Sequence, residues 1–410
     1  MNTLVTNIGQ LVTYNPRSGL VEKYNHATLE ILDGKVSAVF SGENAPFSGE
    51  YDTVVDADGR LVTPGFVDPH THPAFAHTRE SEFTMRIQGM SYQDIAAKGG
   101  GIRNSVRALR GMDETELQQR VLARLQKFPA YGTTTVEAKS GYGLETESEL
   151  KSLRAINFAR ERLPLEIIPT FLGAHEIPDE FQNDREGYID LLCQEMIPVV
   201  GNTGLAEFCD VFCEVGVFDA NESEQILRAA LDNGFKLKIH ADEFESIGGV
   251  QVAANLGAYS ADHLMAITTE GMETLDNADV VPVVLPGTTF FLGHDNYAPA
   301  REMWDRGLPV ALATDFNPGS SMTYSMQMII NLACIKLHLT PDEALQAATY
   351  HAAGAVDREE KKGALSPDYD ADFILWDTTS WALVPYEYGT NKVHSTFIGG
   401  EQVWPPLSHS

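Results

Sequence analysis

The pattern of hydrophobic and polar positions divides the chain into three regions. In residues 1–61, short apolar runs alternate with polar residues, as they do in strands of a half-buried sheet. The pair Asp33-Gly34 separates two such runs, residues 29–32 and 35–40, and is typical of a two-residue hairpin turn. This first region therefore predicts a small antiparallel sheet.

In the second region, short apolar runs alternate with longer stretches whose apolar residues recur every three or four positions. The stretch after Asp113 shows this helical pattern, with Leu117, Val121 and Leu125 on one face. Buried strands that alternate with amphipathic helices are typical of a parallel sheet. Eight such units in about 295 residues predict a (β/α)8 TIM-like barrel. The eight runs are residues 61–67, 133–138, 165–172, 210–215, 236–240, 258–262, 280–285 and 308–314.

In the third region, after about residue 357, strand-like runs return at residues 372–376 and 393–398. The simplest arrangement joins both chain ends into one small β domain beside the barrel. We therefore expect a β-sandwich domain made of residues 1–61 and 357–410, and a barrel domain made of residues 62–356.

The charge balance restricts the possible partners. The chain carries 29 Lys and Arg against 58 Asp and Glu, a formal net charge of −29. Nucleic acids and anionic membranes need a positive surface, so neither is expected as a partner, and an anionic substrate would need a local cation. The sequence shows no apolar run of 18 residues and no basic leader, and its four cysteines form no disulfide framework. We therefore expect a cytoplasmic protein with reduced thiols.

Histidines gather where the predicted strands end. Active sites of such barrels lie at the carboxyl ends of the strands. Five of the twelve histidines lie within a few residues of such an end. They are His70, His72, His175, His240 and His263.

The His70-Thr71-His72 segment indicates a metal site. Residues two apart on a strand point to the same side, so both imidazoles can face one ion, although core packing would also explain the pair. His240 at the end of run five and Asp315 at the end of run eight would complete a nitrogen-rich, oxygen-capped set. Such a set suits zinc or a comparable transition metal.

Several segments resemble a known family. Residues 64–72, which read PGFVDPHTH, resemble the signature of the amidohydrolase superfamily, and the wider pattern is similar to the imidazolonepropionase family of histidine degradation. The matching stretches follow one another in the same order from about residue 62 to 356. They are residues 137–143, 171–175, 240–243, 260–263 and 313–319.

The resemblance implies a hydrolase that opens the cyclic amide of 4-imidazolone-5-propanoate to give N-formimidoyl-L-glutamate. Related two-metal enzymes often carry a carboxylated lysine at the end of strand four. Run four, residues 210–215, has no lysine, and Lys139 ends run two. We therefore expect one divalent or trivalent metal, zinc or iron, per chain. Its expected ligands are His70, His72, His240 and Asp315.

The resemblance also implies roles for single residues. Asp315 would accept a proton from the attacking water and pass it to the leaving nitrogen. His263 would polarise the substrate carbonyl. Arg79 matches the family's substrate arginine and would bind the substrate carboxylate, whereas the alternative is a surface ion pair with Glu80 or Glu82.

Further matched positions are expected to contact substrate or product. Glu243 is expected both to contact the polar edge of the imidazolone and to take part in catalysis. The alternatives are a packing role for Tyr142, a core role for His175, a structural acceptor role for Glu243, and an ordinary turn for residues 317–319. The matched substrate positions are Tyr142, His175, Glu243, Asn317, Gly319 and Ser320.

Two other functions remain open at this stage. A different mononuclear amidohydrolase, such as an aromatic-base deaminase, would share the metal ligands, whereas a non-catalytic scaffold would be expected to lose them. The resemblance implies a homodimer acting on a small carboxylated molecule. Residues 99–101, three glycines, predict a flexible loop, either a lid or a plain surface loop, and His294, His338 and His351 are expected to be structural.

Overall fold

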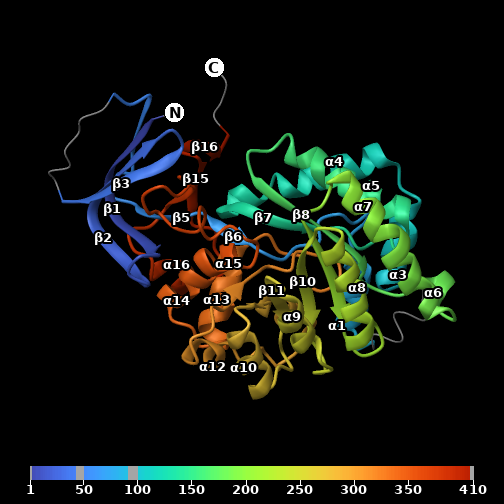
Figure 1. Ribbon diagram of the computed structural model, residues 1–410. Helices are drawn as coiled ribbons and strands as arrows, with labels where there is room; N and C mark the ends of the chain where they lie inside the picture. Colours follow the sequence, from blue (N-terminus) through green and yellow to red (C-terminus); the bar gives the residue numbers. More distant parts are fainter. Residues whose placement is uncertain (1, 43–49, 91–99, 407–410) are drawn as a thin grey trace.

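Two sheets of eight strands organise the chain (Figure 1). The computed structural model describes residues 2–42, 50–90 and 100–406. One sheet takes strands from both chain ends, and the other is the parallel sheet of the barrel. Gly99 of the predicted flexible loop lies outside the described residues, whereas Gly100 and Gly101 lead into a helix.

The sheet of the chain ends begins with a three-stranded antiparallel meander. Strands β1 (Thr3–Asn15), β2 (Leu20–Leu32) and β3 (Lys35–Ser41) pair in sequence order. The predicted hairpin turn is confirmed, because Asp33 and Gly34 both have positive φ, 50° and 76°.

The expectation of a purely antiparallel sheet in the first region is wrong. Strands β4 (Thr53–Asp56) and β5 (Leu61–Pro64) both run parallel to β1. The hairpin places β2 on one side of β1, so the returning chain adds its strands to the other side, in the direction of β1. The sheet is therefore mixed.

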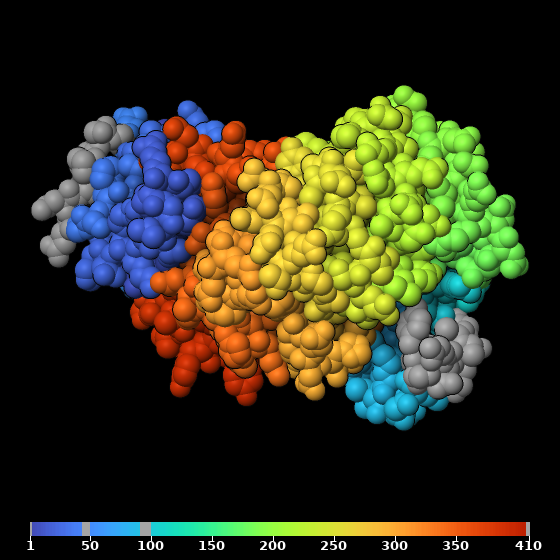
Figure 2. All heavy atoms as spheres, turned by 60° about the horizontal axis from the view of Figure 1, so that its bottom comes forward, coloured from blue at the N-terminus to red at the C-terminus, as the bar shows by residue number. Residues whose placement is uncertain are grey.

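The carboxyl-terminal strands complete this sheet. Strand β14 (Phe373–Trp376) pairs antiparallel with β5, and β15 (Val393–Ile398) and β16 (Glu401–Trp404) extend it. The strands expected to form a β-sandwich thus share one hydrogen-bonded sheet, and Figure 2 shows the two ends of the chain side by side at one end of the molecule.

A buried tryptophan joins this sheet to the barrel. Trp376 donates from its indole nitrogen to Thr63 Oγ1 at 2.9 Å, and its ring lies edge-on to Phe66 with centroids 5.8 Å apart. Phe66 opens the first barrel strand, so the two sheets share one packed contact.

The barrel strands are parallel and adjoin in sequence order. The long apolar runs are explained by burial on both faces, as in β7, whose seven residues are all buried. A parallel bridge between Thr71 and Phe316 joins the segments that follow the first and last strands. The strands are β6 (Phe66–Asp68), β7 (Thr133–Lys139), β8 (Glu166–Ala174), β9 (Phe208–Cys213), β10 (Lys236–Ala241), β11 (Ser260–His263), β12 (Val281–Val284) and β13 (Ala311–Leu312).

Helices surround the barrel, and several begin at a residue whose side chain caps the first turn. Asp113 caps one helix, and Thr340 with Glu343 forms a capping box on another. The amino-terminal helices are α1 (Glu80–Ile87), α3 (Ile102–Arg110), α4 (Glu114–Leu125), α5 (Thr146–Arg160), α6 (Arg185–Leu191), α7 (Ile197–Thr203) and α8 (Ala220–Asp232). The later ones are α9 (Gly249–Leu256), α10 (Thr269–Asn277), α11 (Pro286–Leu292), α12 (Ala300–Asp305), α13 (Met326–Lys336), α14 (Pro341–Ala347), α15 (Tyr350–Gly354) and α16 (Leu383–Tyr386).

The described part of the chain also contains three short helical turns. Within the described ranges, no helix has the length and apolar character needed to cross a membrane. The turns are η1 (Phe128–Tyr131), η2 (Asp179–Phe181) and the π-helical turn η3 (Leu192–Met196).

Candidate metal centre and catalytic cavity

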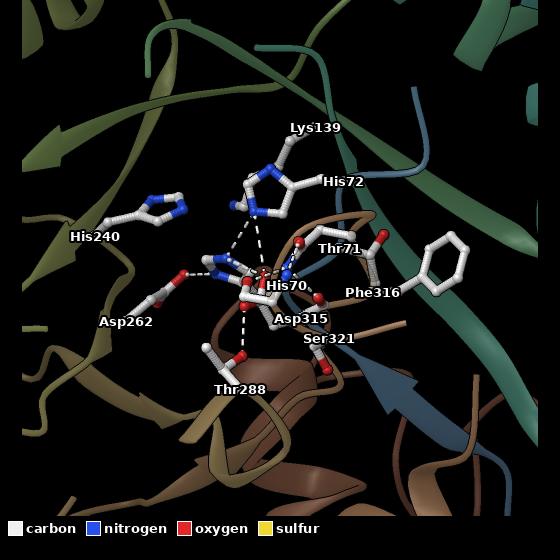
Figure 3. Close-up of polar contacts among 12 residues, drawn as sticks. His70, Thr71, His72, Lys139, His240, Asp262, Thr288, Asp315, Phe316 and Ser321 are labelled. Carbon is white, nitrogen blue, oxygen red and sulfur yellow. Dashed lines mark hydrogen bonds and ion pairs between the residues drawn. The ribbon is translucent and has the colours of Figure 1, made fainter. Parts of the chain in front are cut away.

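Three imidazoles from two strand ends converge at the mouth of the barrel (Figure 3). His70 and His72 follow β6, and His240 lies in β10. One ring nitrogen from each lies within 4.8 Å of the other two, and all three side chains are buried. The structure therefore brings together the three histidines that the sequence predicts as ligands.

The free nitrogens of this cluster fit a metal ion. The Nε2 atoms of His70 and His72 lie 3.1 Å apart, and the buried Nε2 of His240 has no hydrogen-bond partner in the part of the chain that the structure describes. A buried polar atom without a partner is costly, so this nitrogen, beside two further imidazole nitrogens, indicates a site built to bind a cation. Neutral imidazole is the form that ligates metals, and burial lowers the pKa of His70 and His72 well below the usual range.

Asp315 adds the predicted oxygen. Its Oδ1 lies 3.6 Å from His70 Nε2 and 3.4 Å from His72 Nε2. Its Oδ2 accepts a hydrogen bond of 2.6 Å from Thr288, which leaves Oδ1 directed at the imidazoles. Burial raises the pKa of Asp315 to about 6. The residue also has a φ of 52°, an uncommon backbone conformation of the kind that clusters at functional sites.

Carboxylates hold the far nitrogens of two of these imidazoles. Asp262 lies 2.6 Å from His70 Nδ1, and Asp210 lies 3.1 Å from His240 Nδ1. Nδ1–H therefore donates to a carboxylate in each ring, and the lone pair is on Nε2. All four side chains are almost completely buried. The two carboxylates thus fix both the tautomer and the orientation of the rings.

Lys139 forms ion pairs with Asp210 and with Glu137. Its ammonium is 2.8 Å from Asp210 and 2.7 Å from Glu137, and all three side chains are fully buried. Burial alone would raise the pKa of Asp210, but His240 and Lys139 outweigh it and hold that pKa well below the usual range. Lys139 therefore serves as the counter-ion of Asp210.

The centre opens into a cavity of about 740 Å³. Every predicted site residue except His70, which lies beneath the surface of the cavity, contributes to its wall. The predicted residues in this wall are His72, Arg79, Tyr142, His175, His240, Glu243, His263, Asp315, Asn317, Gly319 and Ser320.

His175 and Tyr142 form an aromatic side of the cavity. The ring of His175 stacks on His72 with centroids 5.2 Å apart, and Tyr142 stands edge-on to it at 5.4 Å. His175 Nδ1 donates to the Gly141 carbonyl at 2.8 Å, and burial lowers its pKa to about 3. A neutral His175 therefore presents Nε2, an acceptor, to the cavity.

His263 and Glu243 lie on another side of the centre. The ring of His263 is 5.2 Å from that of His240, and its Nδ1 is 3.7 Å from a Glu243 oxygen. Burial, with Asp315 and Glu214 nearby, raises the pKa of Glu243 well above its usual range. This environment favours the protonated form of Glu243, which can donate a hydrogen bond to a bound ring.

The turn around Asn317 is built mainly by internal hydrogen bonds. The Asn317 side-chain oxygen accepts from the backbone N–H groups of Gly319 and Ser320, each at 2.8 Å. Its amide donates to the Asp315 carbonyl at 2.7 Å. Asn317 therefore shapes the loop that carries Asp315, in keeping with the turn alternative for these residues.

Arg79 lies both in an ion pair and in the wall of the cavity. It pairs with Glu82 at 2.6 Å, and it also lies in the wall of the cavity. Its side chain is 14% exposed, so the pair is not an ordinary surface ion pair.

Several residues of the site could not be identified from the sequence. Asp210 contacts the predicted ligand His240, which is 30 positions away, and Thr288 contacts Asp315, which is 27 positions away. No local sequence pattern marks such contacts. His294, expected to be structural, lies in the wall of the cavity. Other wall residues that sequence reasoning missed are Glu82, Arg86, Glu176, Phe212, Glu214 and Phe244.

The barrel, its histidine–aspartate centre and the sequence comparisons together define the class. The profile described as "Amidohydrolase family" matches residues 53–98 and 89–404. Among solved structures, E. coli guanine deaminase aligns over 98% of this chain and 99% of its own, with a TM-score of 0.75 and 16% identity. The 5-methylcytosine deaminase of Klebsiella pneumoniae, with bound phosphonocytosine, aligns over 100% and 99%, with a TM-score of 0.74 and 15% identity. At such identities the likeness shows the fold.

Curated relatives narrow the class to one family. The imidazolonepropionase of Bacillus velezensis is 43% identical over 98% of this chain and 97% of its own length. That of Haloarcula marismortui is 46% identical over 95% and 93%. The chain belongs to the imidazolonepropionase family of the amidohydrolases, which confirms the resemblance seen in the sequence.

Proposed function

We propose that this enzyme hydrolyses the ring amide of 4-imidazolone-5-propanoate to give N-formimidoyl-L-glutamate, a step in histidine degradation. Membership of the imidazolonepropionase family supports the reaction. The observation that carries the proposal is one cavity that contains both the histidine–aspartate centre and a half-buried arginine, Arg79. The first can hydrolyse an amide, and the second can hold the propanoate.

We propose that His70, His72, His240 and Asp315 hold one metal ion, and that zinc and iron are the candidates. Three nitrogens and one oxygen suit either ion. When bound, such an ion acts as a Lewis acid that lowers the pKa of water toward 7. Because Lys139 is already held by Glu137 and Asp210, it is not available to bridge a second ion.

Asp315 is the proposed proton carrier. Water adds to the carbonyl carbon and loses a proton to the Asp315 carboxylate, after which the ring C–N bond breaks and the leaving nitrogen takes that proton. A pKa of about 6 suits both halves of this transfer near neutral pH. Thr288 holds the other carboxylate oxygen and keeps the carrier in place.

His263 and Glu243 are proposed to contact the reacting amide and ring. His263 lies next to His240, so its ring N–H can donate to the oxygen on which negative charge develops. Glu243, protonated, can donate to a nitrogen on the polar edge of the ring. Tyr142 and His175 would cover the flat face of the imidazolone.

The carboxylate of the substrate is proposed to bind Arg79, with Asn317, Gly319 and Ser320 forming the neighbouring wall. In a chain with a net charge of −29, the overall field repels anions, so a local cation is required. This requirement favours the imidazolone over the uncharged base of an aromatic-base deaminase, the second candidate.

One assay separates the two candidates. The loss of imidazolone absorbance is followed together with the amounts of N-formimidoyl-L-glutamate and ammonia. The proposed function predicts one formimidoyl product for each ring consumed and no ammonia. Release of ammonia with the ring intact would identify a deaminase instead.

We further propose a cytoplasmic homodimer that has no nucleic-acid or membrane partner. The strong negative charge supports the absence of nucleic-acid and membrane partners, and the resemblance to the family is the reason to expect a homodimer. Sedimentation velocity of the full chain tests the oligomeric state.

A further inference from the structure

Arg79 is held along one edge of its guanidinium group. Its Nε and Nη2 both donate to a single oxygen of Glu82, at 2.9 and 2.6 Å. The Arg79 and Glu82 side chains are only 14% and 10% exposed, and both line the cavity. Nη1 is left outside this pair, so one edge of the group remains for a ligand.

The other oxygen of Glu82 fixes the carboxylate itself. Oε1 accepts a hydrogen bond of 3.1 Å from the backbone N–H of Gly101, where α3 begins. Glu82 therefore ties α1, which Arg79 precedes, to α3, whose first residue Ile102 also lines the cavity. A carboxylate fixed at both oxygens cannot follow the arginine if it moves.

Gly319 leaves room for the free edge of the arginine. A Cβ built on Gly319 would lie 2.5 Å from Arg79 Nη1, far inside contact distance. Its φ lies outside the left-handed region, so the backbone does not demand glycine here. Close approach of the guanidinium group explains the absence of a side chain at this position.

We propose that Glu82 is the positioning residue of the carboxylate site: it holds Arg79 so that Nη1 faces the cavity beside Gly319, and so selects a substrate with a carboxylate tail. An arginine that is already ordered loses less side-chain entropy when a ligand binds. The inference rests on the proposed function, in which Arg79 binds the propanoate.

The test compares Glu82→Gln with Glu80→Gln as a matched control. Glu80 is an exposed acid in the same first turn of α1 and lies outside the wall of the cavity. For 4-imidazolone-5-propanoate, Glu82→Gln should raise KM about tenfold and leave kcat within about twofold, because a charge-assisted contact that orients the arginine is weakened. Glu80→Gln should leave both unchanged.

A second substrate separates positioning from a merely structural role. The same imidazolone with a propanamide tail carries no charge, so Glu82→Gln should not change its KM. An equal change for both substrates would overturn the proposal. An unchanged KM of Glu82→Gln for the propanoate would also overturn the proposal. A lower KM would overturn it too, because it would mean that Glu82 competes with the substrate carboxylate for Arg79.

Gly319→Ala keeps the proposal falsifiable if Glu82→Gln does not fold. The added methyl group meets the far end of a flexible side chain, so the protein should fold while Nη1 is displaced. KM should rise at least tenfold for the propanoate and not for the propanamide, and equal KM changes would contradict the role. If the wild-type enzyme does not open the ring of the propanoate substrate at all, the proposed function is wrong. If the wild type is active and Glu82→Gln changes neither KM nor kcat, only this inference is wrong.

Discussion

The three clustered imidazoles differ in the hydrogen-bond partner of their Nδ1 atoms. Asp262 holds His70 and Asp210 holds His240, whereas Nδ1 of His72 has no hydrogen-bond partner among the described residues. Carboxylates behind ligating histidines orient the ring and increase its basicity. The site therefore depends on residues that do not themselves touch the ion.

Replacing one of these carboxylates should weaken metal binding. Asp210→Asn removes the charge behind His240, and we expect a loss of roughly 10–100-fold in metal affinity. Competition with a chelator measures the affinity. Asp232→Asn, an exposed aspartate at the end of α8, is the control and should match the wild type. An Asp210→Asn enzyme that keeps its metal as tightly as the control would contradict this role.

Removing His263 should instead affect turnover. His263→Ala deletes the proposed donor to the developing oxyanion, and kcat should fall roughly 100–1000-fold. Metal content should stay at the wild-type level, since the three clustered nitrogens belong to other histidines. Both are measured on the same sample, with the exposed His394→Ala as control. Near-normal turnover would remove His263 from the mechanism.

Sequence reasoning predicted the clustered histidines but not the carboxylates that contact them. His70 and His72 could be predicted because a two-residue spacing on a strand has a fixed geometric meaning. The Asp262 contact with His70 spans 192 positions, and only the closed barrel creates it. Glu82 was considered only as a possible surface partner of Arg79, because sequence alone does not show that the pair is buried.

At the scale of elements, the alternation of apolar runs and amphipathic stretches was sufficient to predict the barrel. Each predicted run overlaps a barrel strand, although the first run, residues 61–67, is divided between β5 of one sheet and β6 of the other. Periodicity reports burial, and both strands are buried, so it could not show this change of sheet. The parallel pairing of β1 with β4 and β5 was missed for a similar reason, since pairing partners are set by topology.

Helix α15 provides a test of stability against pH. His351 donates from Nδ1 to the Val310 carbonyl at 3.0 Å and accepts from Gln346 at Nε2, so it is held in the neutral form. Burial lowers its pKa to about 4. Below about pH 6.5 the His351 imidazole is protonated in the unfolded chain but stays neutral in the folded chain. The free energy of unfolding therefore falls as the pH decreases.

The expected effect is a pH-dependent difference between wild type and His351→Gln. Relative to the variant, the wild type should lose about 2 kcal/mol of unfolding free energy between pH 7.5 and pH 5. Urea unfolding at both pH values measures it, and the exposed His394→Gln serves as control. If wild type and variant differ in unfolding free energy by the same amount at both pH values, His351 is not held in its neutral form.

At the scale of the whole molecule, strands from both chain ends form one sheet, and the parallel sheet of the residues between those ends forms the barrel. We propose that residues 1–61 with 357–410 and residues 62–356 are the two domains, coupled through the contact between Trp376 and Phe66. The negative charge of the whole chain and the half-buried Arg79 in the cavity wall are consistent with selective binding of one anion. Anions in general are repelled, whereas one that fits the cavity meets a cation there.

The central claim is that distant residues, gathered by the barrel, hold one metal ion that the hydrolysis requires. The most direct test titrates metal-free enzyme with zinc or iron and follows ring opening of 4-imidazolone-5-propanoate at each step. The account predicts no turnover in the chelated protein and activity that rises in proportion to bound metal, with a plateau at about one ion per chain. Full activity without metal, or a plateau at two ions, would contradict it.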